Sequence, residues 1–128
     1  MSEEKKNVEK RPLFYAKASV ETMMRKFKGP DLPPRGRFHY HQGVFLSGVY
    51  KTYQACGDER YFQYVKSWVD SCIDENGVIL DCDKTQLDDQ QAGILLYPLL
   101  DRTGDAKYKK ALDAILPVIR EFPRNEAG

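Results

Sequence analysis

The sequence predicts an all-α protein built from antiparallel helix hairpins. Three observations support this fold class: apolar residues recur with helical spacing, Gly-Asp pairs separate consecutive apolar segments, and the pattern returns after 47 positions. The repeat is clearest where Gly57-Asp58-Glu59-Arg60-Tyr61 returns as Gly104-Asp105-Ala106-Lys107-Tyr108. Because one helix pair cannot bury its own apolar face, units of this kind have to stack on one another.

The first third of the chain is expected to contain one helix and one constrained loop. Residues 1–12 are rich in Glu and Lys and are expected to form a charged, flexible lead-in, while residues 13–128 form a single domain. Helical spacing of apolar residues predicts a helix over residues 13–27, which Gly29-Pro30 ends. Three prolines and two glycines in residues 29–36 then predict a loop of restricted conformation.

Four more helices are expected after this loop, each with a recognisable start or stop signal. They cover residues 44–56, 59–74, 89–102 and 106–121. Gly57 and Gly104 are expected as C-terminal stops, and Asp58 and Asp105 as the N-caps that follow them. Asn76-Gly77 predicts a turn, and the β-branched pair after it a short extended piece. The last helix is expected to bury Tyr108, Ala111, Leu112, Ile115, Leu116, Ile119 and Phe122, with an irregularity at Pro117.

The composition is that of a folded protein whose charge identifies no partner. The 128 residues are 41% hydrophobic and 30% charged, with a mean hydropathy of -0.61. The net charge is only +1 and no basic run alternates with aromatics, so we expect no nucleic-acid partner. We expect no membrane partner either, because no apolar run approaches spanning length and no secretory signal is visible. Cys56, Cys72 and Cys82 are expected as free thiols, which predicts a cytoplasmic location.

If the protein has a chemical function, we expect it in residues 78–93, where Asp88 and Asp89 stand at the start of a predicted helix. Position alone favours helix capping for both carboxylates, because free N–H groups and the helix dipole stabilise negative charge there. His39 and His41 could bind a metal, but no Cys, Asp or Glu stands at the usual zinc spacing. The acidic residues of segment 74–83 do not fit a calcium loop. We therefore expect no metal and no cofactor.

Three other side chains have both a functional and a structural interpretation. Trp68 could be a platform for a sugar ring, but its place in an apolar helical stripe favours core packing. Arg35 and Arg37 could meet an anionic sugar, but their loop position favours solvation.

An ordered set of motifs extends over most of the chain. The set comprises Tyr40-x-x-Gly43, Gly57-Asp58-x-x-Tyr61, Asp74-x-x-Gly77-x-Ile79, Leu87-Asp88-x-x-x-x-Gly93, Thr103-Gly104-Asp105-x-Lys107-Tyr108 and Pro123-Arg124-Asn125-Glu126-x-Gly128. In order and spacing, the sequence from Leu13 to Gly128 resembles the unsaturated rhamnogalacturonyl hydrolases and the related unsaturated glucuronyl hydrolases, which are glycoside hydrolases of families 105 and 88. The resemblance implies an (α/α)6 barrel, a ring of six helix hairpins, with about five of its twelve helices present.

The resemblance also implies a substrate and a reaction. Such enzymes act on a Δ4,5-unsaturated uronic acid at the non-reducing end of an oligosaccharide, and they hydrate its double bond so that the next sugar is released. This chemistry needs a carboxyl group that donates a proton and activates water. Asp88 falls on the family's Leu-Asp motif and is implied as one of two active-site carboxylates. Tyr40 and His41 fall in the aromatic motif that lines the cleft, where Phe38 replaces a usual tryptophan and is expected to keep an aromatic wall.

The second family aspartate, which is implied as the main acid and base, would follow Gly128. The chain is therefore expected to be an N-terminal fragment that hydrolyses nothing alone and that exposes apolar surface on its last helices. The alternative is a non-enzymatic helical-repeat module that binds a partner on the concave side of its hairpins. Neither the oligomeric state nor the sugar linked to the uronate is predicted.

Overall fold

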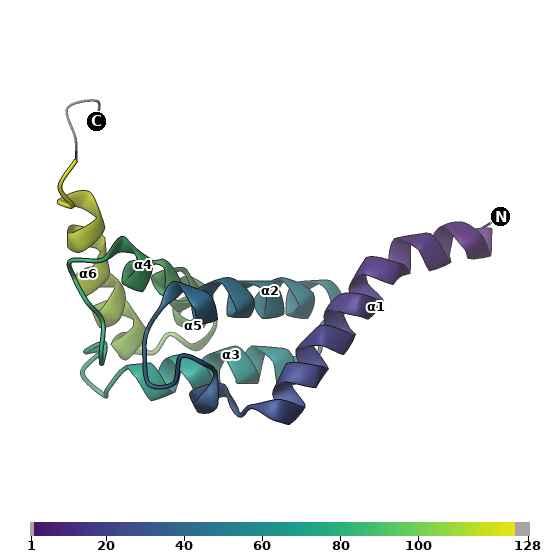
Figure 1. Cartoon of the computed structure of the whole chain (residues 1–128), viewed down its shortest axis with the longest axis horizontal. Coiled ribbons are helices and arrows are strands. Elements are labelled where there is room, and N and C mark those ends of the chain that lie inside the picture. The colour runs from purple at the N-terminus through teal and green to yellow at the C-terminus, as the bar shows by residue number, and fades with distance from the viewer. Residues whose placement is uncertain (1, 125–128) are drawn as a thin grey trace.

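The computed structural model describes residues 2–124, with side chains from Arg11 onward, and confirms the all-α prediction (Figure 1). Its elements are α1 (Ser2–Lys26), the 3-10 turn η1 (Gly29–Asp31), α2 (Tyr40–Cys56), α3 (Glu59–Cys72), α4 (Leu87–Gln90), the 3-10 turn η2 (Gln91–Leu95), α5 (Leu96–Thr103) and α6 (Ala106–Arg120). The helices α2 and α3 pack as one hairpin and α5 and α6 as the next, and the two hairpins meet where α2 contacts η2.

The 47-residue repeat is present in the structure. The helices α2 and α4 begin at Tyr40 and Leu87, and α3 and α6 begin at Glu59 and Ala106, so each pair of starts is 47 positions apart. Equivalent helices of the two units therefore begin at the same end of the stacked hairpins. The 47-residue spacing in the sequence therefore corresponds to the spacing of helix starts in the structure.

The predicted stop and cap signals at the connections between paired helices are confirmed. Gly57 and Gly104 end α2 and α5 in the left-handed conformation, with φ values of 72° and 66°. Asp58 and Asp105 follow as N-caps, and each accepts a hydrogen bond from the backbone N–H two residues later, at 3.1 and 3.0 Å. Because a glycine ends one helix and the next residue, an aspartate, caps the following helix, each connection is short and the two helices it joins are antiparallel.

The helix α1 is longer than predicted. It begins at Ser2 and continues through Pro12, so the expected lead-in over residues 1–12 is helical from Ser2 onward. Glu and Lys are good helix formers, and an interior proline costs roughly 3 kcal/mol without always ending a helix. The first half of α1 extends away from the hairpins (Figure 1), and Phe14 on it is 66% exposed, whereas Val20 is buried.

The helix predicted over residues 89–102 is instead divided into α4, η2 and α5. Pro98 has no backbone N–H for the carbonyl of Ile94, and its ring would crowd that carbonyl in an α-helix. The 3-10 turn η2 ends at Leu95, so Pro98 lies in the first turn of α5, where its missing N–H removes no hydrogen bond of that helix. A helix-period pattern alone could not predict this break, because the apolar spacing continues through it.

Two glycines allow η2 to pack closely on its neighbours. A Cβ on Gly43 of α2 would lie 2.1 Å from Gln91 Oε1 and 2.9 Å from the Cα of Ala92. A Cβ on Gly93 would lie 2.9 Å from Cδ1 of Ile115 in α6. Gly43 therefore allows close packing between the two repeat units, and Gly93 allows close packing within the second unit.

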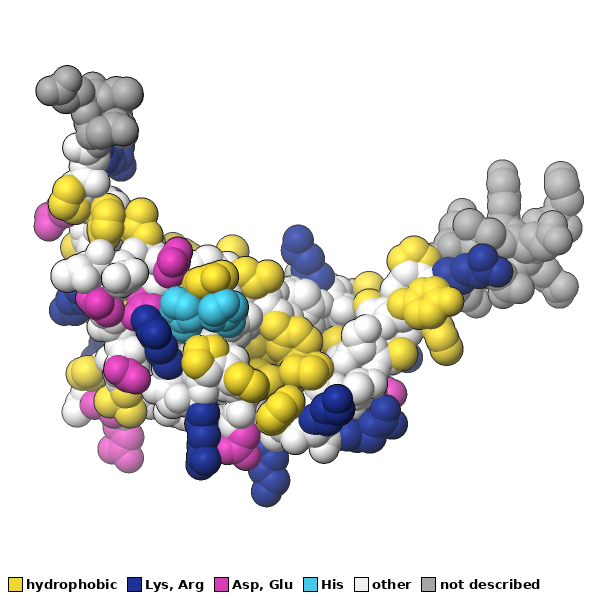
Figure 2. Space-filling model, viewed as in Figure 1, with side chains coloured by type: hydrophobic (Ala, Val, Ile, Leu, Met, Phe, Trp, Pro, Cys, Tyr) yellow, Lys and Arg dark blue, Asp and Glu magenta, His cyan; other side chains and the backbone are white. Residues whose placement is uncertain are grey.

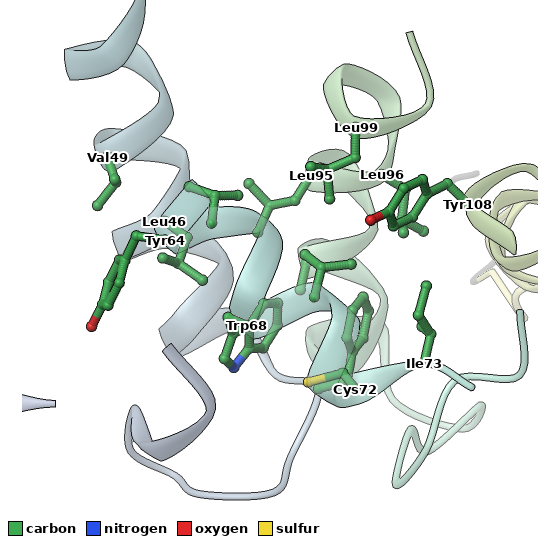
Figure 3. Packing of buried hydrophobic residues seen from close by; sticks show 14 of the residues in the cluster. Leu46, Val49, Tyr64, Trp68, Cys72, Ile73, Leu95, Leu96, Leu99 and Tyr108 are labelled. Atoms are coloured by element: carbon green, nitrogen blue, oxygen red, sulfur yellow. The ribbon is translucent and has the colours of Figure 1, made fainter. Parts of the chain in front are cut away.

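One cluster of buried apolar side chains joins the two hairpins (Figure 3). Its largest fully buried members are Trp68, Tyr61, Tyr108, Phe38, Phe62, Leu46, Leu95, Leu96 and Leu99. Trp68 is 1% exposed and stacks on Phe38 with ring centroids 5.4 Å apart, which confirms its predicted core role. Phe38 is completely buried in this contact, so the expectation that it forms a wall of the cleft is wrong. Phe38 packs in the core because its ring stacks on Trp68, a residue that is distant in sequence.

The polar loop between α3 and α4 contains the predicted turn. Asp74 Oδ1 accepts hydrogen bonds from the N–H groups two and four residues later, both at 2.9 Å, and Gly77 has a φ of 76°. Ile73 and Ile79 form an antiparallel bridge across the turn, as the predicted short extended piece requires. Because the Asp74 carboxylate is engaged by the backbone, it acts as a turn residue.

The helix α6 buries only part of the face that the sequence predicts. Its core residues are Tyr108, Ala111, Leu112 and Ile115. Ile119 is 42% exposed and lines a groove of about 270 Å³ between α6 and the segment α4–α5, together with the exposed residues Leu87, Ile94 and Tyr97. The prediction that Ile119 is buried is therefore wrong, and the expected exposed apolar surface on the last helices is present. We call this surface the α5–α6 groove.

None of the helices in residues 2–124 has the length and apolar character needed to cross a membrane.

Candidate active site

The three predicted site residues lie at one end of the hairpins. Tyr40 and His41 form the first turn of α2, Asp88 lies in α4, and these two short stretches contact each other (Figure 1). His41 and Asp88 are 47 positions apart and are equivalent in the repeat. Both are exposed, whereas Tyr40 is half-buried. Consecutive repeat units therefore contribute the ring pair Tyr40–His41 and the carboxylate of Asp88 to the end of the hairpins where α2 and α4 begin. We call this end the rim.

Three rings gather at the start of α2. The centroids of Tyr40 and His41 are 4.1 Å apart, and the ring of His39 lies 4.6 Å from the first and 4.8 Å from the second. The two histidines form one patch on the molecular surface, beside acidic and basic side chains (Figure 2). Phenol and imidazole groups donate and accept hydrogen bonds, so this patch is suited to polar ligands that also present a flat face.

Asp88 and Asp89 have different environments. No hydrogen bond or ion pair to the Asp88 carboxylate is found within residues 11–124. Asp89 is only 1% exposed, and its carboxylate is fully engaged. The prediction that Asp89 is a helix cap or a solvated residue is therefore wrong, since the N-cap of α4 is Gln86, which makes no side-chain capping bond.

The Asp89 carboxylate connects two segments that are distant in sequence. Its Oδ1 accepts a hydrogen bond from His39 Nδ1 at 2.7 Å and lies 3.4 Å from Nη2 of Arg37. Its Oδ2 accepts the backbone N–H of Asp83 at 2.8 Å. We call the three side chains and this backbone group the Asp89 clamp. It joins the loop before α2 to the loop before α4.

These contacts determine the charge of Asp89. Burial by itself raises the pKa of the Asp89 carboxyl, but the Asp83 N–H, the His39 hydrogen bond and the Arg37 charge together hold that pKa below its usual value. Asp89 is therefore an ionised, hydrogen-bonded group at neutral pH and is poorly suited to proton transfer. Asp88, exposed at the rim, is the carboxylate of this pair that a ligand can reach.

Gln42 has a role in the first unit that resembles the role of Asp89 in the second. The two residues are 47 positions apart, and each is 1% exposed at the third position of its helix. Gln42 Nε2 donates to the carbonyl of Pro34 at 2.6 Å, so it ties the proline-rich loop to the start of α2. In both units a buried polar side chain holds the preceding loop against the helix start.

The sequence pattern could have identified Asp89 through this equivalence. Repeat positions that hold polar residues on a buried helical face are candidates for loop-anchoring groups, and Gln42 and Asp89 are such a pair. The sequence pattern could not identify His39 as the partner of Asp89, because this contact joins residues 50 positions apart in different repeat units.

Within the described part of the chain, no three His, Cys, Asp or Glu side chains are grouped closely enough to hold a metal ion. The α5–α6 groove begins at Leu87, beside Asp88, but its exposed lining is apolar and offers no charged group to a polar ligand. The exposed polar groups at this end of the molecule therefore include Asp88 and His41, which lie outside the lining of the groove.

Comparison with known proteins identifies a matching family and a similar solved structure. The family described as Glycosyl Hydrolase Family 88 matches residues 15–128. The structure is also similar to that of a family 105 glycoside hydrolase of C. acetobutylicum ATCC 824, with a TM-score of 0.77 and 27% sequence identity. That alignment covers 88% of this chain and 31% of the other, so the chain spans about a third of its structural relative.

Proposed function

Because the chain belongs to glycosyl hydrolase family 88, we propose that it supplies one side of an active site that removes a Δ4,5-unsaturated uronic acid from the non-reducing end of an oligosaccharide. Asp88 is assigned as a catalytic carboxylate, and Tyr40 and His41 as substrate-binding residues. The observation that carries the assignment is the meeting of α2 and α4, which brings an exposed carboxylate and a ring cluster to one rim.

The proposed reaction is hydration of the double bond in the unsaturated ring. A proton is added to one carbon of this bond and a hydroxyl group from water to the other, which gives a hemiketal. Opening of the hemiketal releases the next sugar. Asp88 is suited to proton transfer or water activation because it is exposed and free of competing partners within residues 11–124. The rings of Tyr40 and His41 provide hydrogen-bonding groups and a flat face for the sugar.

The test uses the protein expressed from its natural reading frame with an unsaturated uronyl disaccharide. Loss of the ultraviolet absorbance of the conjugated double bond reports hydration, and chromatography reports the released sugar. We expect Asp88→Asn to lower kcat by about 10²-fold or more, the usual contribution of a general acid or base. The control is Asp113→Asn, because Asp113 is an exposed aspartate of α6 that pairs with Lys109.

Different results would refute different parts of the proposal. Equal cleavage of the saturated uronoside would indicate ordinary glycoside hydrolysis at the anomeric carbon. Wild-type kcat in Asp88→Asn would remove the catalytic role of Asp88. Binding of the unsaturated disaccharide without any turnover would favour the non-enzymatic binding module.

A cytoplasmic location is also proposed. It is supported by the free thiols of Cys56, Cys72 and Cys82, which are usual in a reducing compartment. Fractionation of cells that produce the protein would test this proposal, and recovery in a secreted fraction would contradict it.

A further inference from the structure

The helix starts at the two ends of the hairpins are stabilised differently. At the end of the hairpins where α3 and α6 begin, Asp58 and Asp105 cap these helices by accepting backbone N–H groups. At the opposite end, where α2 and α4 begin, the N-cap residues are His39 and Gln86, and neither makes a side-chain capping bond. The side chain of His39 instead reaches across to the other helix. The two helices that carry the candidate site are therefore attached to each other at their first turns.

This attachment places a charge where a charge is costly. An ionised carboxylate that is 1% exposed loses its hydration, and only good hydrogen bonds and opposite charges offset that loss. The clamp supplies such contacts, because His39 Nδ1 and the Asp83 N–H lie within 2.8 Å of the two carboxylate oxygens and Arg37 stands at 3.4 Å. A simple cap at position 86 would stabilise α4 without burying a charge.

Both backbone polar groups of Asp83 are hydrogen-bonded. Its N–H bonds to the Asp89 carboxylate, and its carbonyl accepts a hydrogen bond from Gln90 Nε2 at 3.0 Å. Gln90 also donates to the carbonyl of Gln86 at 3.3 Å. The loop that leads into Asp88 is thus anchored at several points, and Asp88 is an exposed residue directly before Asp89 of the clamp.

From this arrangement we infer that Asp89 is a positioning residue, which through His39 and the Asp83 N–H sets the place of Asp88 relative to Tyr40 and His41. This inference rests on the proposed function for the role of Asp88. Asp89 touches no substrate, because it is buried beneath the rim. Its effect on turnover is indirect: a displacement of the reacting carboxylate by about 1 Å is enough to lower a rate by roughly 10²-fold.

The experiment compares Asp89→Ala, Asp89→Asn and the control Asp105→Ala in the protein expressed from its natural reading frame. The control removes an ordinary cap at the opposite end of the hairpins. Each variant is assayed with an unsaturated uronyl disaccharide over a range of pH, below its own melting temperature, and its structure is determined.

We expect Asp89→Ala to lower kcat by about 10²-fold with a much smaller change in KM. Asp89→Asn should recover part of this loss, because its side-chain oxygen still accepts the Asp83 N–H. Asp105→Ala should melt earlier and keep the wild-type kcat.

A wild-type kcat in folded Asp89→Ala, or an equal loss of kcat in Asp105→Ala, would overturn the inference. If Asp89→Ala does not fold, Asp89→Asn decides, and a pH profile of kcat identical to that of the wild type refutes the positioning role. If the wild type itself releases no sugar, the proposed function fails, and the structures then decide the positioning separately. Movement of Asp88 away from Tyr40 in the variants would support it, and an unmoved α4 would overturn it.

Discussion

At the scale of single residues, Asp89 couples the stability of the fold to pH. Its pKa is lower in the folded protein than its ordinary value of 3.8, so ionised Asp89 favours folding above that pH. This contribution is lost as the pH falls through the folded-state pKa. We expect Asp89→Asn to unfold more easily than the wild type at pH 7 by roughly 1.5–3 kcal/mol, the usual value of a hydrogen bond to a charged group.

Urea denaturation from pH 7 to pH 3 measures this effect. The difference in unfolding free energy between the wild type and Asp89→Asn should shrink towards the acidic end. Asp113→Asn is the control, because it removes an exposed carboxylate and should change the free energy of unfolding little. A difference that stays constant over this pH range would show that the charge of Asp89 does not contribute.

Gly43 and Gly48 lie on the same helix and should respond oppositely to alanine. A methyl group at Gly43 would meet Gln91 Oε1 at 2.1 Å and the backbone of Ala92, so we expect Gly43→Ala to lose roughly 1–3 kcal/mol through overpacking. Nothing lies within 4 Å of the corresponding position at Gly48, and Gly48→Ala should gain about 0.5–1 kcal/mol of helix propensity. Chemical denaturation of both variants measures the pair, and equal effects would contradict the close contact of α2 with η2.

Among single residues, local chemistry was predictable and long-range pairing was not. Trp68 was predicted as a core residue because its helical stripe is visible in the sequence. The burial of Phe38 and the engagement of Asp89 depend on partners that only the folded chain brings near. Asp88, Tyr40 and His41 were selected by resemblance to a family, and the structure places them on adjoining helix starts. Their roles are still predictions.

At the scale of elements, the caps are separable parts. Asp105 does little besides accept the N–H of Lys107 and begin α6, so Asp105→Ala should lower the free energy of unfolding by about 1 kcal/mol. Asp105→Asn should keep most of the stability, because its side-chain oxygen can still accept this bond. Thermal denaturation distinguishes the two variants, and an equal loss in both would assign the effect to charge instead of capping.

Helix starts and stops could be predicted because glycine and aspartate act within a few residues of their own position. Two of the failures at this scale involve proline, whereas the start of α2 at Tyr40, earlier than the predicted residue 44, does not. Pro12 was interpreted as a boundary, but the helix α1 continues through it. The effect of Pro98 was missed, although its absent N–H accompanies a change from α to 3-10 geometry in η2. Proline constrains a helix without determining whether the helix ends, bends or tightens.

At the scale of the whole molecule, the α5–α6 groove leaves apolar side chains of the last helices exposed to solvent. Ile94 and Tyr97 are 55% and 52% exposed and face the same groove as Ile119. We expect the 128-residue chain by itself to bind a hydrophobic dye and to associate at high concentration. The double substitution Ile94→Glu, Ile119→Lys should reduce both effects, as measured by dye fluorescence and light scattering.

The matched control for this surface is Phe14→Glu. Phe14 is as apolar as the groove residues and more exposed, but it lies on the projecting part of α1. If Phe14→Glu reduced dye binding as much as the groove substitutions, the groove would not be the principal apolar surface.

The 47-residue repeat has a consequence for how such a rim could have arisen. A unit that carries its own stop and cap signals can be copied within a gene without spoiling the helix boundaries of its neighbours. Each added copy would contribute one helix start to the rim, where equivalent positions can carry different groups, as His41 and Asp88 show. A repeated framework with one differing position per unit thus presents an asymmetric set of chemical groups on a symmetric edge.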